Sequence, residues 1–82
     1  MVSVDPVLKA ALRQLRSVRS QRPADPADPY ELAEWREAMA WALDELAQVL
    51  LFEEDRTRAR MEAEAARAEA AQLRAGHTGH AS

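Results

Sequence analysis

The chain has 82 residues, of which 48% are hydrophobic and 30% are charged, and it contains no cysteine. This length predicts one small domain and excludes a catalytic cleft between two lobes, and the lack of cysteine excludes disulfide stabilisation. The formal net charge of −3 opposes nucleic-acid binding by the chain as a whole. Because a single core of this size seldom supplies more than about 3–5 kcal/mol, we expect self-association to add to its stability.

The composition predicts an all-α fold, since the chain has two glycines, four prolines and few β-branched residues. The longest stretches without a charged residue, such as residues 46–52, are far shorter than the ~20 residues that span a bilayer. The first residues do not show a basic segment followed by an apolar one, so no secretory signal is predicted. We therefore expect a cytoplasmic protein with no membrane partner.

The first predicted helix covers residues 6–20. Asp5 supplies an N-cap acceptor, and Pro6 takes the first helical position, where its missing N–H has no cost. Apolar residues then recur at intervals of three and four, which is the period of one helix face. They are Val4, Leu8, Ala11, Leu15 and Val18, with Val7 and Leu12 widening the face.

The polar side of this helix carries a basic stripe, which we define as Lys9, Arg13, Arg16 and Arg19. Residues 1–22 hold five basic residues against one acidic residue, whereas residues 23–82 hold six against thirteen. Two interpretations stay open. The stripe either pairs with acidic residues of the next helix, in the same chain or in another subunit, or contacts the phosphates of a nucleic acid. The acidic candidates are Glu31, Glu34, Glu37, Asp44 and Glu45.

A proline-rich turn over residues 23–29 leads into a second predicted helix. Asp28 is its N-cap, Pro29 its first residue, and Glu31 completes a variant of the capping box. No proline or glycine follows until Gly76, so we expect one long helix over residues 29–74. Residues 1–75 would then form a single helical hairpin, followed by a flexible tail over residues 76–82.

The main apolar stripe of the long helix predicts the core of this hairpin. The stripe contains Leu32, Trp35, Met39, Leu43, Leu46 and Leu50, and it continues more thinly through Thr57, Met61, Ala65 and Ala68. The first helix can cover only the first third of the second. The predicted hairpin core is therefore Leu8, Leu12, Leu15, Leu32, Trp35, Met39, Leu43 and Leu46.

Residues 39–52 are apolar on more than one face, so one partner helix cannot bury them. We expect two hairpins to assemble into a dimeric four-helix bundle or coiled coil. The predicted self-association or partner interface consists of Tyr30, Trp41, Leu50, Leu51, Phe52 and Met61. A different protein bound at these aromatic residues, or an apolar ligand between the helices, are the alternatives.

The residues that carry chemistry do not predict an enzyme. The chain has no cysteine, and both histidines, His77 and His80, fall in the predicted tail, where they would make at most an adventitious metal site. The run Glu53-Glu54-Asp55 is typical of a solvated helix face. Glu34 and Glu37 lack the Glu-x-x-His pattern of a bundle metal site. We expect no catalytic residue, no cofactor and no metal.

The sequence thus predicts a non-enzymatic, cytoplasmic helical hairpin that self-associates, with a dimer favoured, and acts as a small interaction, adaptor or regulatory module. The alternative is a small nucleic-acid-associated regulator, of antitoxin-like or phage type, that uses the basic stripe as its phosphate contacts.

Overall fold

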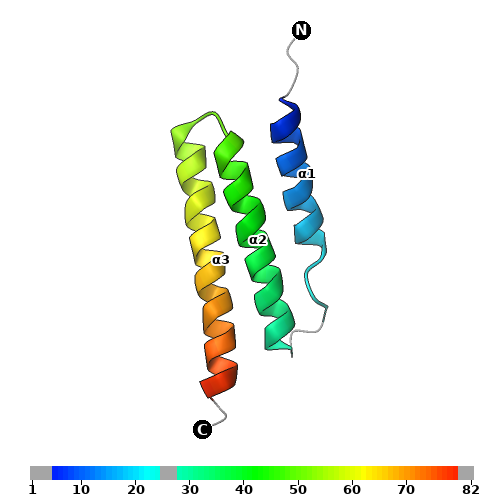
Figure 1. Cartoon of the computed structure of the whole chain (residues 1–82), viewed down its shortest axis with the longest axis vertical. Coiled ribbons are helices and arrows are strands. Elements are labelled where there is room, and N and C mark those ends of the chain that lie inside the picture. Colours follow the sequence, from blue (N-terminus) through cyan, green and yellow to red (C-terminus); the bar gives the residue numbers. More distant parts are fainter. Residues whose placement is uncertain (1–4, 25–27, 80–82) are drawn as a thin grey trace.

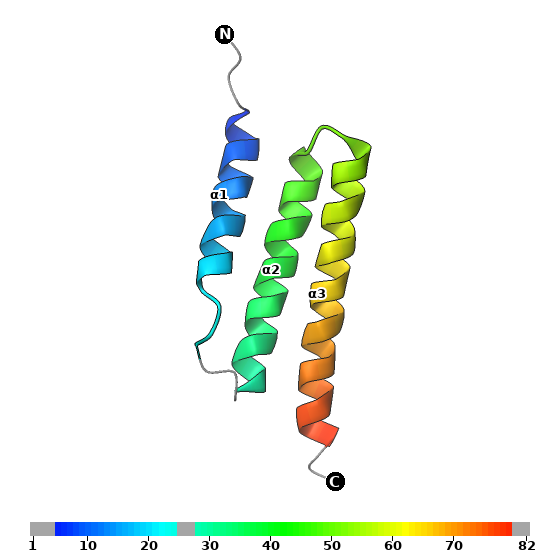
Figure 2. The same cartoon turned by 180° about the vertical axis from the view of Figure 1, so that it is seen from behind.

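The computed structural model describes residues 5–24 and 28–79, and within them the fold is all-α, as predicted. Three helices follow one another: α1 (Pro6–Ser20), α2 (Pro29–Val49) and α3 (Glu53–Gly79). They lie side by side and successively antiparallel, with α2 in the middle (Figures 1 and 2). None of the described helices is both long enough and apolar enough to cross a membrane.

The two predicted helix starts are confirmed. Asp5 accepts a 2.9 Å hydrogen bond from the backbone N–H of Val7 at the start of α1, and Pro6 follows it. Asp28 accepts hydrogen bonds of 3.0 and 3.2 Å from the N–H groups of Tyr30 and Glu31 at the start of α2. These side chains satisfy donors that have no partner inside a helix.

The single long helix over residues 29–74 is wrong, because the chain turns at residues 50–52 and α3 returns along α2 (Figure 1). Leu50 is extended, with φ −72° and ψ 140°, so no proline or glycine is needed for the break. Glu53, Glu54 and Asp55 occupy the first turn of α3, where carboxylates are favoured by the positive end of the helix dipole. The acidic run is largely solvated on a helix, as predicted, and it also marks the start of that helix.

Alanines form most of the contact between α2 and α3. Ala33, Ala40 and Ala47 are buried at intervals of seven on α2. On α3 the buried residues follow intervals of four, three and four; they are Ala59, Ala63, Ala66 and Ala70. The predicted continuation of the apolar stripe through Thr57, Met61, Ala65 and Ala68 is wrong, since all four are exposed. The break at residues 50–52 changes the angular position at which α3 begins, so a different face is buried.

The contact between α1 and α2 contains the larger side chains of the core. Leu15 and Val18 of α1 are buried in one cluster with Met39, Leu43 and Leu46 of α2. Trp35 is partly buried against this cluster and donates a 2.7 Å hydrogen bond from Nε1 to the carbonyl of Val18. Two guanidinium groups lie near its ring, Arg22 at 5.4 Å and Arg36 at 4.9 Å from the centroid.

The remaining members of the predicted hairpin core lie at its edge or outside it. Leu8 packs partly buried against the cluster and Leu32 is half-buried. Leu12 is exposed, so placing it in the core is wrong. At 100° per residue its position is about 90° from the mean direction of the buried residues of α1, toward the solvent.

Two further expectations change with the third helix. The predicted helix end near residue 74, with Gly76 as the cap, is wrong because α3 continues through Gly76 to Gly79. The predicted two-helix hairpin is also wrong, since the described residues form three helices. The third helix packs on a second face of α2, whereas Trp41 of the predicted interface stays exposed. His80 lies outside the described residues.

Candidate association surface

The described part of the molecule buries many small side chains and leaves several large apolar ones exposed. Fourteen hydrophobic residues are buried, and nine of these are alanine. No large side chain is fully buried. By contrast Trp41, Leu51 and Phe52 are 70%, 83% and 69% exposed. Apolar surface of this size in water favours association, so these residues define the candidate site.

Trp41 lies at the middle of the exposed side of α2. At 100° per residue it shares this side with polar residues that are also exposed. We call this set the α2 outer face; it comprises Tyr30, Glu34, Ala38, Trp41, Glu45 and Gln48. These residues lie outside the arc that the buried residues of α2 occupy, and Trp41, Glu45 and Gln48 border α1 across a groove. One helix thus presents an aromatic residue between carboxylates and amides to the solvent.

A groove runs beside Trp41 between α1 and α2. It has a volume of about 820 Å³, and α1 forms one wall with Val7, Ala10 and Gln14. Trp41 and Val49 contribute to the other wall. A smaller depression of about 270 Å³ continues it toward the end of α1. The groove makes Val7 part of the surface, although its position in the sequence indicated only a wider apolar face of α1.

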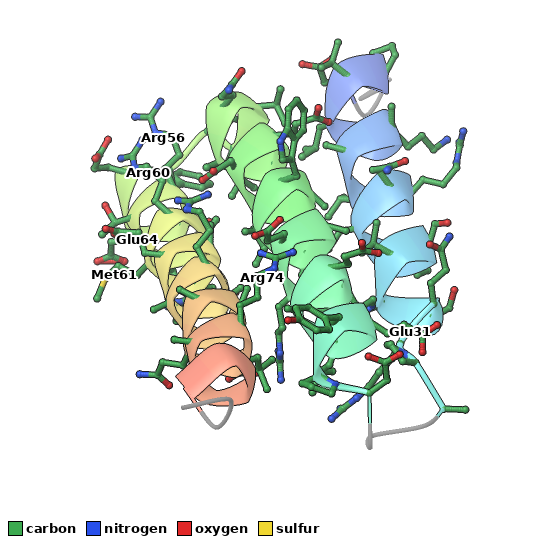
Figure 3. The ribbon with its side chains drawn as sticks, turned by 60° about the horizontal axis from the view of Figure 1, so that its bottom comes forward. Glu31, Arg56, Arg60, Met61, Glu64 and Arg74 are labelled. Carbon is green, nitrogen blue, oxygen red and sulfur yellow. The ribbon has the colours of Figure 1, made fainter. Side chains whose placement is uncertain are left out.

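The other predicted interface residues do not all lie on this surface. Leu51 and Phe52 are in the turn after α2, at the end of the molecule where α1 begins (Figure 1). Leu50 is half-buried against the core. Met61 is exposed on α3, on the side away from α2, as Figure 3 shows. The structure therefore groups Tyr30 with Trp41 on α2 and separates Met61 from them.

Acidic residues of α2 pair with arginines of α3. Asp44 binds Arg67 at 2.6 Å, Glu37 binds Arg74, and Arg36 binds Glu69 in the opposite sense. The hydrogen bond to Glu37, with the charges of Glu37 and Glu34, raises the pKa of Arg74 above its ordinary value. These pairs are largely exposed, so they stabilise the contact between α2 and α3 only weakly. Their main effect is on the register of the two helices.

The basic stripe has no such partners. Lys9, Arg13, Arg16 and Arg19 are all exposed, and none makes an ion pair with a described residue. Of the five acids expected to neutralise the stripe, Glu37 and Asp44 bind arginines of α3 instead. The positive charge of the basic stripe is therefore not neutralised by an ion pair with the described residues of the chain.

Within the described residues no group of three or more histidine, cysteine, aspartate or glutamate side chains could hold a metal ion. The chain was compared with known proteins, and no family model, curated protein or solved structure matches it. Function is therefore inferred from the geometry of this chain.

Proposed function

We propose that this chain is a non-enzymatic helical module that binds another protein chain, in the first place a second copy of itself, through the α2 outer face. The observation that supports the proposal is the exposure of large aromatic side chains on a helix whose buried residues include many alanines. Alanine fills most of the core, while Trp41 at the centre of α2 is largely in water. A side chain of this size gains about 2–3 kcal/mol when it is removed from water.

The groove beside Trp41 supports the same surface. It extends the apolar contact from α2 to Val7 and Ala10 of α1, so a partner would meet two helices and not one. The nearby carboxylates are at the rim, which is where polar residues lie in protein interfaces.

Sedimentation equilibrium tests the proposal with a matched pair of variants. Trp41→Ala removes the central residue of the surface, and Met61→Ala removes a similarly exposed residue, 63% exposed, on the far side of α3. The parent should sediment at no less than twice the 9.2 kDa chain mass at micromolar concentration. Trp41→Ala should raise the dissociation constant at least about tenfold, and Met61→Ala should leave it nearly unchanged.

A parent that stays monomeric at all concentrations would contradict self-association. If such a monomer were folded and stable, a different protein chain would be the partner for the surface. Equal effects of the two variants would contradict the placement of the surface on α2.

A second candidate, nucleic-acid binding, is favoured by the basic stripe on α1. Its four cations have no acidic partner among the described residues, so they are available to phosphates. Four phosphate contacts would make log K fall with log salt at a slope of about −3 to −4. The opposing observation is the excess of thirteen acids over six basic residues in residues 23–82.

Duplex binding at low salt, followed by fluorescence anisotropy, tests this candidate. Arg13→Ala with Arg16→Ala should abolish about half of the salt slope, whereas Arg58→Ala on α3 makes a charge change of the same kind away from the stripe. Binding that is absent at low salt, or equally sensitive to Arg58→Ala, would contradict a role of the stripe.

A further inference from the structure

Three of the four aromatic residues of the chain are spaced at intervals of eleven: Tyr30, Trp41 and Phe52. Eleven residues make three helical turns within about 20°, so Tyr30 and Trp41 lie on the same side of α2. Tyr30 is in the first turn of α2, Trp41 is at its middle, and Phe52 is in the turn that follows its last residue. All three are exposed. The aromatic residues therefore mark the start and the centre of the exposed side of α2 and the turn that follows it.

Tyr30 and Phe52 are equally far from Trp41 in the sequence, so the order of spacings is the same when the chain runs in the opposite direction. When two copies of α2 cross antiparallel at Trp41, the first turn of each, with Tyr30, lies beside the end of the other, where the following turn carries Phe52. From this spacing we infer that a second copy docks antiparallel on α2, with Trp41 of both copies at the two-fold axis and Tyr30 of each beside Phe52 of the other. This inference rests on the proposed self-association and adds its orientation and register.

The charges on the α2 outer face favour the antiparallel arrangement. In a parallel pair, Glu34 would face Glu34 of the second copy, and Glu45 would face Glu45, which opposes like charges at both positions. In the antiparallel pair, Glu34 faces Gln48 of the second copy. Glu45 of the second copy lies near Glu37, which already carries the guanidinium of Arg74 as its partner.

The area also suits a second copy. Tyr30 is 43% exposed, and Trp41 and Phe52 are each about 70% exposed. With about 150–250 Å² available for each aromatic side chain, the six aromatic residues of a pair supply roughly 700 Å². A stable interface starts at about 1,200 Å² in total, so the aromatic row supplies more than half of it. Leu51, 83% exposed beside Phe52, adds to this area.

Site-specific crosslinking tests the register, and the chain offers a clean background because it has no cysteine. Glu34→Cys and Gln48→Cys replace two exposed residues, so neither substitution disturbs the core. A bis-maleimide that spans one helix contact, about 8–10 Å, should give a crosslinked dimer when the two variants are mixed. Each variant alone should give none, because equivalent residues are about 21 Å apart along the antiparallel helices. Gln48→Cys mixed with Met61→Cys is the control for random collision.

The outcomes separate the register from the association itself. Crosslinking of each single variant with itself would overturn the antiparallel arrangement in favour of a parallel one. A dimer in the sedimentation experiment that gives no crosslink in any combination would overturn the inference, while the proposed self-association would stand. A monomer in sedimentation would overturn both.

Discussion

Replacement of a buried alanine by leucine at the contact between α2 and α3 should distinguish the observed three-helix fold from a single long helix over residues 29–74. Ala63 is fully buried at this contact, whereas Ala65, two residues later on the same helix, is exposed. Ala63→Leu adds three carbons to a contact between alanines, and overpacking of this kind costs about 1–3 kcal/mol. Ala65→Leu adds the same atoms in solvent. Leucine and alanine differ little in helix propensity, so packing alone separates the two variants.

Urea unfolding, followed by far-ultraviolet circular dichroism, measures the difference. If the free energy of unfolding of the parent is about 3–5 kcal/mol, Ala63→Leu should remove between a fifth and most of it, with an unchanged m value. Ala65→Leu should change the free energy of unfolding by no more than a few tenths of a kcal/mol. The reverse order of the two variants would mean that the face containing Ala65 is the buried one, and it would refute the turn at residues 50–52.

Three further outcomes are expected. Trp35→Phe keeps an aromatic ring but removes the Nε1 hydrogen bond to the Val18 carbonyl, so it should cost about 1 kcal/mol and increase amide exchange in α1 more than in α3, as measured by hydrogen exchange. Glu54→Gln removes a carboxylate from the first turn of α3 and should lower the unfolding free energy by about 0.3–1 kcal/mol in low salt, with a smaller effect in high salt. Tyr30→Ala and Phe52→Ala should be non-additive in a double-mutant cycle on the dimer dissociation constant, with a coupling of about 0.5–1.5 kcal/mol; additive effects would show that the two rings do not meet.

The helix starts could be predicted because their signals are local. An aspartate before a proline satisfies free N–H groups and presets the first dihedral angle, whatever the rest of the chain does. Asp5 and Asp28 both act in this way. The chain order of α1, the proline turn and the start of α2 follows from these two pairs.

The turn at residues 50–52 does not follow from proline or glycine, because the helix ends at a leucine with an ordinary extended backbone. Its signal was present in the sequence: three apolar residues are followed directly by Glu53, Glu54 and Asp55, which favour a helix N-terminus. A second signal was the alanine spacing from Ala59 to Ala70, which marks a buried face that the long-helix prediction did not use. Both signals are weak alone and consistent together.

The candidate surface could be predicted only in part. The angular position of Trp41 on α2 follows from helix geometry, and the structure leaves this residue in solvent. The groove beside it could not be predicted, since it depends on how α1 lies across α2. The pairing of the acids could not be predicted either, because two of the five that the stripe was expected to meet, Glu37 and Asp44, bind arginines of α3.

The alanine core links the stability of the chain to its association. A buried alanine contributes one methyl group, about 0.8 kcal/mol, against about 1.5–3 kcal/mol for a larger apolar side chain. Close approach of α2 and α3 therefore stabilises the monomer only modestly, while Trp41, Leu51 and Phe52 stay exposed. In the proposed dimer, a partner at one hundred times its dissociation constant adds about 2.7 kcal/mol by mass action, which is comparable with the stability of the monomer itself. Substitutions on the α2 outer face should thus lower the apparent stability although they leave the core unchanged. Core and outer-face substitutions can be told apart only when unfolding is measured at protein concentrations below the dissociation constant of the dimer.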